Sequence, residues 1–196
     1  MSALWIALIV VPVLFVVVVV LLDYGRNKEV VSEVKTLNPE GDGGTALVVY
    51  HLGKSDFQRR VFSGFVEGLV SRGWRVEITT PSSQAPTDLS GYDLLVLGGP
   101  TYWFTPNRPI RRYLSRLGDL GGQRTVTIIT ALGAGERSTS IMEKQVREAN
   151  GDLGNALLLY KMRPNDDDNY VDSQQNQALA VEMATQAAKE IPLPGA

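Results

Sequence analysis

The sequence predicts an α/β fold in three layers, with a five-stranded parallel sheet between helices and one further apolar helix in front of it. Two observations predict the sheet. Short apolar runs rich in β-forming residues recur along residues 45–196, and segments with helical spacing of apolar residues separate them. The third observation is an uncharged, strongly apolar stretch near the N-terminus, at residues 3–22.

The apolar stretch has the length of a membrane-spanning helix. Its residues, about 20 of them, would extend ~30 Å as a helix, which matches the hydrocarbon core of a bilayer. The stretch lacks the basic start and small-residue cleavage site of a secretory signal. We therefore predict an uncleaved transmembrane anchor at residues 1–22, with a cleaved signal or a buried helix as the alternatives. Arg26, Lys28 and Lys35 follow it, so the positive-inside rule predicts a single-pass membrane protein whose folded domain is cytoplasmic.

Residues 23–44 are polar and end in a glycine-rich segment. This composition predicts a linker that is flexible at its glycine end. The predicted organisation is therefore an anchor at 1–22, a linker at 23–44 and a folded domain at 45–196.

The folded domain alternates predicted strands with predicted helices. Residues 45–50 suit a strand buried on both faces, whereas 74–79 alternate apolar and polar side chains as an edge strand does. Ser55 and Gln58 have the spacing of a helix capping box. The other predicted strands are 93–97, 125–130 and 155–160. One helix is predicted between Ser55 and Gly73, and further helices are predicted at 110–117, 140–149 and 174–189. Sheets of this kind bind ligands beyond the carboxyl ends of their strands, so the loops at 51–55, 98–109 and 131–138 are the candidate site.

The first loop, residues 51–55, has the features of a phosphate subsite. Its candidate residues are His51, Gly53, Lys54 and Ser55. Gly53 permits close approach to the backbone, and the amides at the start of the following helix attract an anion. Lys54 and Ser55 add a charge and a hydroxyl. The spacing of a nucleoside-triphosphate loop is missing. The alternative is that Ser55 only caps the helix and that His51, the single histidine, has a structural role.

The second loop, residues 98–109, presents consecutive aromatic side chains. Neighbouring prolines restrict this loop, and aromatic faces can stack on a flat ring. The alternatives are that the aromatic residues pack under the loop or form a patch that contacts a protein. Its candidate binding residues are Gly99, Pro100, Thr101, Tyr102 and Trp103.

The third loop, residues 131–138, begins with small residues. Ala131, Gly133 and Ala134 are its candidate binding residues, because small side chains let the edge of a ring reach backbone amides. A plain surface turn is the alternative.

Composition and spacing argue against several other functions. The 19 basic and 21 acidic residues give a net charge of −2, so nothing favours a nucleic acid as partner. The chain has no cysteine, which excludes disulfides. Asp166, Asp167 and Asp168 cluster after the last strand without the pattern of a Ca²⁺ loop, so we predict a solvated turn and no metal, with partner docking as a further role for it. No catalytic residue can be assigned from spacing.

A phosphate subsite beside an aromatic loop predicts flavin mononucleotide (FMN) as the cofactor. From about Thr45 onward the chain resembles the flavodoxin-like FMN-binding proteins, which include flavodoxins and NAD(P)H-quinone oxidoreductases. The resemblance implies strand order 2-1-3-4-5. Gly53-Lys54-Ser55 is similar to the end of the family's phosphate loop, and Gly99-Pro100-Thr101-Tyr102-Trp103 to its second flavin loop. Leu52 departs from the pattern because it has no hydroxyl.

Two functions from different classes follow. The first is a membrane-anchored FMN protein that takes part in electron transfer or in NAD(P)H- and quinone-type oxidoreduction, with quinone, NAD(P)H or a redox protein as partner. Because flavodoxins are usually strongly acidic and this chain is nearly neutral, its reduction potential is predicted to be less negative than theirs. The alternative is a flavin-free, membrane-tethered interaction module that keeps the fold.

Overall fold

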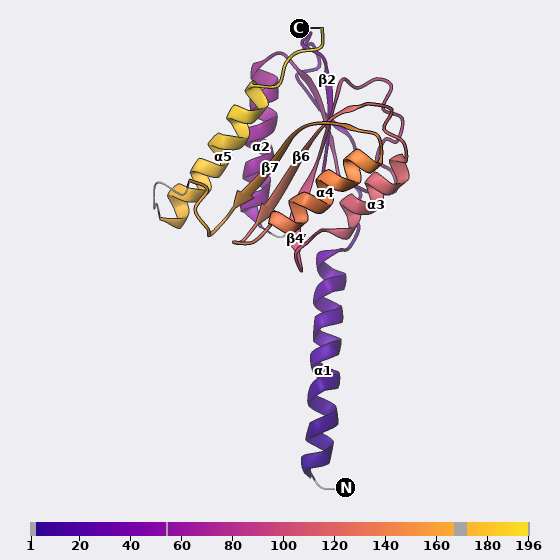
Figure 1. The fold of residues 1–196 in the computed structure, drawn as a ribbon, viewed down its shortest axis with the longest axis vertical. Coiled ribbons are helices and arrows are strands. Elements are labelled where there is room, and N and C mark those ends of the chain that lie inside the picture. The colour runs from indigo at the N-terminus through magenta and orange to yellow at the C-terminus, as the bar shows by residue number, and fades with distance from the viewer. Residues whose placement is uncertain (1–2, 54, 167–171, 196) are drawn as a thin grey trace.

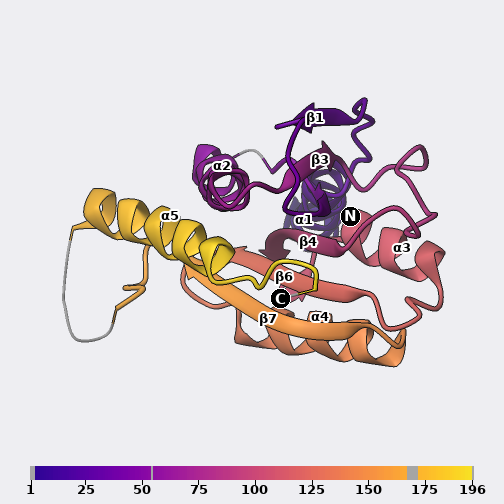
Figure 2. The same ribbon diagram turned by 90° about the horizontal axis from the view of Figure 1, so that it is seen from above.

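The computed structural model describes residues 3–53, 55–166 and 172–195, and within them a seven-stranded sheet lies between two layers of helices (Figures 1 and 2). The helices are α1 (Ala3–Arg26), α2 (Asp56–Ser71), α3 (Arg108–Leu117), α4 (Glu136–Glu148) and α5 (Ser173–Lys189). The strands are β1 (Lys35–Leu37), β2 (Thr45–Tyr50), β3 (Arg75–Thr79), β4 (Leu94–Tyr102), β5 (Thr105–Pro106), β6 (Arg124–Ala131) and β7 (Asp152–Tyr160).

The centre of the sheet has the five parallel strands that the sequence predicts, in the order β3-β2-β4-β6-β7. The prediction of an all-parallel sheet with β3 at its edge is wrong, because β1 pairs antiparallel with β3 and places Lys35 opposite Ile78. The short β5 pairs antiparallel with the end of β4. The sheet is therefore mixed, and both additional strands are too short to stand out in the sequence.

The core lies on both faces of the sheet, as the uninterrupted apolar strands require. On β2, Ala46 and Val48 pack into the cluster that includes α2 and α5, whereas Leu47 and Val49 pack into the cluster that includes α3 and α4. Successive side chains of a strand point to opposite faces, so a strand covered on both sides is apolar at every position. Figure 2 shows these helix pairs on the two faces.

Residues 23–44 form a strap along the domain instead of the flexible linker that composition predicts. Asp23 Oδ2 lies 3.0 Å from Arg108 Nη2, and Asn27 Oδ1 accepts a hydrogen bond of 2.9 Å from the Arg108 amide. Further along, Glu29 accepts hydrogen bonds from the amide and hydroxyl of Ser83, at 2.6 and 2.8 Å. Strand β1 completes the strap. These contacts join residues about 50 to 80 positions apart, which no local composition encodes.

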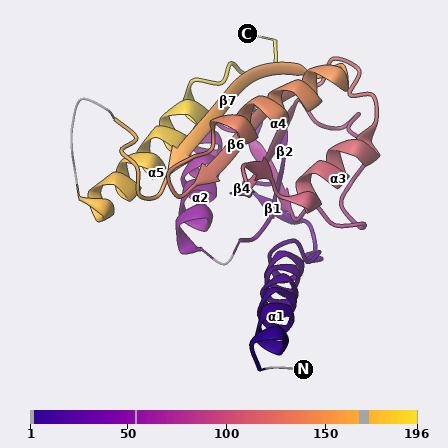
Figure 3. The same ribbon diagram turned by 60° about the horizontal axis from the view of Figure 1, so that its bottom comes forward.

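Helix α1 extends away from the sheet and contains Pro12 (Figures 1 and 3). Among the residues that the structure describes, no helix combines the length and apolar character needed to cross a membrane. The prediction of a single-pass membrane protein with a cytoplasmic domain is wrong on this finding.

Candidate functional site

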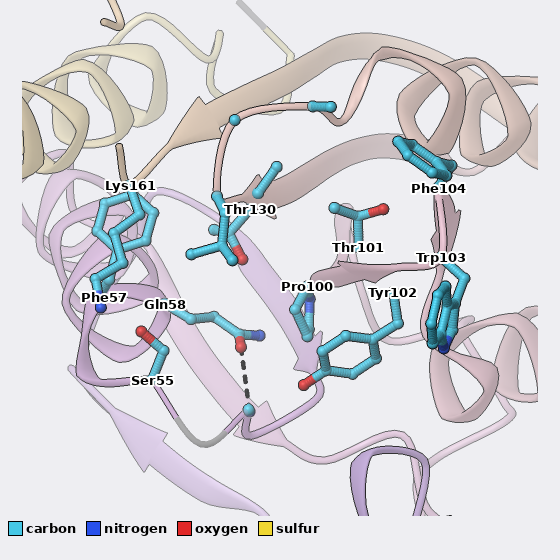
Figure 4. A pocket seen from close by; sticks show the side chains of 15 residues that line it. Ser55, Phe57, Gln58, Pro100, Thr101, Tyr102, Trp103, Phe104, Thr130 and Lys161 are labelled. Carbon is cyan, nitrogen blue, oxygen red and sulfur yellow. Dashed lines mark hydrogen bonds between the residues drawn. The ribbon is translucent and has the colours of Figure 1, made fainter. Parts of the chain in front are cut away.

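The three loops named from the sequence converge on one cavity of about 620 Å³ at the carboxyl ends of β2, β4 and β6 (Figure 4). Such a volume lies within the usual range for small-molecule sites. The predicted residues that line this cavity are Gly53, Ser55, Pro100, Thr101, Tyr102, Trp103, Ala131, Gly133 and Ala134.

The structure does not bring two predicted residues to the cavity wall. His51 is buried, and its carbonyl oxygen accepts a hydrogen bond from Gln58 Nε2. Gly99 lies behind the wall, where an added Cβ would be 2.2 Å from Asn107 Oδ1. Because of this contact, Gly99 is needed for close packing beneath the site. A third predicted residue, Lys54, is outside the described residues.

Six lining residues were not among those assigned to the site from the sequence, although one of them, Phe104, belongs to the aromatic run of the second loop. They are Phe57, Gln58, Phe104, Thr130, Leu132 and Lys161. Phe57 and Gln58 belong to the first turn of α2, and Lys161 directly follows the last parallel strand, so their place at the same edge of the sheet was a usable signal. Thr130 and Leu132 flank Ala131, which was predicted. Figure 4 shows Lys161 and Phe57 at one end of the cavity and Trp103 and Phe104 at the other.

The second loop is a tight β-hairpin whose turn is strained. Trp103 and Phe104 are its two central residues, with φ of 52° and 60°. Two consecutive positive φ angles are typical of a type I′ turn, which normally uses Asn and Gly. Each non-glycine residue in this conformation costs about 1–2 kcal/mol. The turn keeps both rings largely exposed, Trp103 at 62% and Phe104 at 57%, and such strain is typical of binding sites.

Hydrogen bonds hold the hairpin against α4. Thr101 and Ser138 join their hydroxyls, and Thr101 Oγ1 also donates to the carbonyl of Thr105 at 3.3 Å. Thr105 Oγ1 donates to the carbonyl of Tyr102 at 2.9 Å. The second loop and the start of α4 therefore form one rigid wall, from which the ring of Tyr102 points toward the first loop (Figure 4).

The first loop is closed by the side chain of Gln58. Its Oε1 accepts a hydrogen bond of 3.1 Å from the Gly53 amide, and its Nε2 donates to the His51 carbonyl. The predicted capping box is therefore wrong: Ser55 is the N-cap residue of α2, but its hydroxyl makes no cap bond, and Gln58 reaches past it into the loop.

The third loop is shorter than predicted because α4 begins at Glu136. The Glu136 carboxylate accepts hydrogen bonds from the Gly135 amide at 2.9 Å and from the Tyr160 hydroxyl at 2.7 Å, and it pairs with Arg163. Hydrogen bonds from its own amide, from Tyr160 and from Gly135 lower the pKa of Glu136 to about 2. This network fixes the loop to the end of β7.

The cavity wall is mostly apolar and contains little charge. Among the described lining residues, Lys161 is the single one with a formal charge. Within the described part of the chain, no group of three or more metal-ligating side chains gathers. Of the aspartate cluster, Asp166 is described, whereas Asp167 and Asp168 lie outside the described residues.

Comparison with known proteins agrees with this geometry at the level of the fold. No protein-family model matches the chain, and no curated protein matches its sequence. Among solved structures, an archaeal flavodoxin is 18% identical with a TM-score of 0.50, over 74% of this chain and 99% of that one. Oxidised Flavodoxin 2 from Bacillus cereus is 18% identical with a TM-score of 0.54, over 73% and 98%.

A third similar structure is the NAD(P)H:quinone oxidoreductase of Methanothermobacter marburgensis, 16% identical with a TM-score of 0.51, over 75% of this chain and 98% of that one. At such identities the likeness describes architecture. The protein therefore has the flavodoxin-like α/β fold.

Proposed function

We propose that this protein binds FMN in the cavity between its three loops and takes part in electron transfer or in NAD(P)H- and quinone-type oxidoreduction. The observation that carries the proposal is the strained hairpin, which holds two aromatic rings at the mouth of a cavity of about 620 Å³. Strain that does not help the fold is retained where it serves binding.

The residues present fit the flavin ring. Tyr102, Trp103 and Phe104 supply aromatic faces, and stacking on a flat ring contributes about 0.5–1.5 kcal/mol beyond burial. Gly133 and Ala134, which also line the cavity, offer a backbone that a ring edge can approach. When bound, the flavin would supply the redox chemistry, while these residues would orient the ring and exclude water from one face.

The phosphate end fits less well. The Gly53 amide, which a phosphate would need, is already bonded to Gln58, and Leu52 offers no hydroxyl. The ring pocket is thus the stronger part of the site.

We also propose the partner of the redox reaction, which is quinone, NAD(P)H or a redox protein. The similar structures include an NAD(P)H:quinone oxidoreductase and two flavodoxins, and these names support both a two-electron and an electron-carrier role. The exposed rings of Trp103 and Phe104 also offer a contact for a redox protein.

A flavin-free interaction module is the second candidate. It is favoured by one observation, which is that Gln58 already satisfies the first loop without any ligand. In this case the exposed rings at the hairpin tip would contact a partner protein.

One experiment separates the two functions. The purified chain is examined for flavin absorption bands and, after removal of any bound flavin, titrated with FMN. We expect uptake of one FMN with quenching of its fluorescence, and replacement of Tyr102 and Trp103 by alanine should weaken it about tenfold. A colourless protein that takes up no added FMN would leave the interaction module as the function.

A further inference from the structure

The carboxamide of Gln58 fills the place in the first loop where an anion would bind. Gln58 is 2% exposed, and both polar atoms of its side chain are bonded, one to the Gly53 amide and one to the His51 carbonyl. An atom in the Cβ position of Gly53 would lie 2.3 Å from Gln58 Oε1. The space above this glycine is therefore occupied by an oxygen atom of the protein itself.

An incoming phosphate oxygen would have to displace Gln58 before it could reach the Gly53 amide. Both hydrogen bonds of the carboxamide would break, and the buried His51 carbonyl would lose its partner from Gln58. Losing two hydrogen bonds of a buried side chain is unfavourable. Much of the gain from binding a phosphate is thus offset by the contacts that it replaces.

Among the described residues, the charges beside the first loop also disfavour a phosphate. Asp56 lies in the first turn of α2, where its carboxylate offsets the positive end of the helix dipole. Its pairing with Arg59, at 3.6 Å, is between exposed side chains and neutralises little of this charge. The one charged lining residue described, Lys161, follows β7 and is not part of the first loop.

We propose that the site recognises a flavin by its ring and that the 5′-phosphate adds little to affinity, so that riboflavin and FMN bind with similar strength. This inference depends on the proposed flavin binding and names its ligand class: flavins with or without a phosphate. Gln58 is the residue that makes the site indifferent to the phosphate.

The test compares the dissociation constants of riboflavin and FMN for the full chain, measured by flavin fluorescence quenching. Their ratio, riboflavin over FMN, is expected to be below about ten in the wild-type protein. In Gln58→Ala the Gly53 amide becomes available, and the ratio should rise at least about fivefold, chiefly through tighter FMN binding. Gln58→Ser serves if the alanine variant does not fold. Gln175→Ala, an exposed glutamine in the first turn of α5, is the matched control and should leave the ratio unchanged.

Each outcome has a distinct meaning. A wild-type ratio above about ten, or a ratio that Gln58→Ala and Gln58→Ser leave unchanged, overturns the role of Gln58 while flavin binding stands. An equal rise in the control removes the assignment to Gln58. A wild-type chain that binds neither flavin refutes the proposed function itself, and this inference with it.

Discussion

Trp103 and Phe104 occupy the two central positions of the β4–β5 turn with left-handed backbones, at φ of 52° and 60°. A turn of this type is ordinarily made by small residues that tolerate such angles. The chain thus keeps two large rings where the backbone disfavours them. These two residues therefore lower the stability of the fold.

Replacing both residues, as Trp103→Asn with Phe104→Gly, should stabilise the fold and weaken flavin binding. Relief of about 1–2 kcal/mol per residue corresponds to a melting temperature at least about 3 °C higher in a protein of this size. Loss of two stacking rings should weaken FMN binding about tenfold. Thermal melts and fluorescence titration measure the two effects.

Asn150→Gly is the control for this variant, since Asn150 also has a positive φ, 57°, and does not line the cavity. It should leave flavin affinity unchanged. A hairpin variant that melts at a lower temperature than the wild type would show that the turn is not strained.

The contact between Gly99 and Asn107 gives a second prediction. An added Cβ on Gly99 would lie 2.2 Å from Asn107 Oδ1, so Gly99→Ala should destabilise the protein by about 1–3 kcal/mol. The Asn107 side chain is 1% exposed, and its polar atoms have no hydrogen-bond partner within the described structure. Shortening it in Gly99→Ala with Asn107→Ala should therefore restore at least half of the loss, measured by urea unfolding. Strictly additive losses would contradict the proposed clash.

Glu136 predicts a dependence of stability on pH. Its pKa falls from an ordinary 4.5 to about 2 in the folded protein, so the unfolded chain binds its proton first as the pH drops. The stabilisation is complete above pH 4.5 and is lost as the pH falls toward 2. Glu136→Gln should thus melt at a lower temperature than the wild type at pH 7, and the difference should shrink between pH 4.5 and 2.

Glu143→Gln, on the same helix, is the control for this series and should lower the melting temperature at pH 7 less than Glu136→Gln does. A difference between Glu136→Gln and the wild type that stays constant down to pH 2 would assign the effect to packing instead of charge.

Lys161 should raise the reduction potential of a bound flavin. A cation at the cavity wall stabilises the added negative charge of the reduced ring, so Lys161→Gln should shift the midpoint potential to more negative values, on the order of 10–40 mV. A spectroscopic redox titration measures the shift. Lys144→Gln, exposed on α4 and absent from the cavity wall, should leave the potential unchanged. A shift of the same size in both variants would exclude a local effect of Lys161.

The parallel core and the three loops could be predicted because they depend on local patterns. The uninterrupted apolar run of β2 predicts a strand covered on both faces, and the structure places Ala46 and Leu47 in opposite clusters. The pairing of Lys35 with Ile78 could not be predicted. Strand β1 has three residues, too few to show the alternation of polar and apolar side chains that marks a strand. The membrane prediction is wrong because, among the described residues, no helix has the length and apolar character needed to cross a membrane.

The sequence by itself determined the alternation of strands and helices and the edge of the sheet where the loops meet, because buried parallel strands and amphipathic helices require distinct spacings of apolar residues. Only the tertiary structure decided that Gln58 closes the first loop and that Trp103 and Phe104 adopt left-handed backbones. The first depends on a side chain reaching across a turn, and the second on the hairpin overriding local preference. Residue type encodes neither.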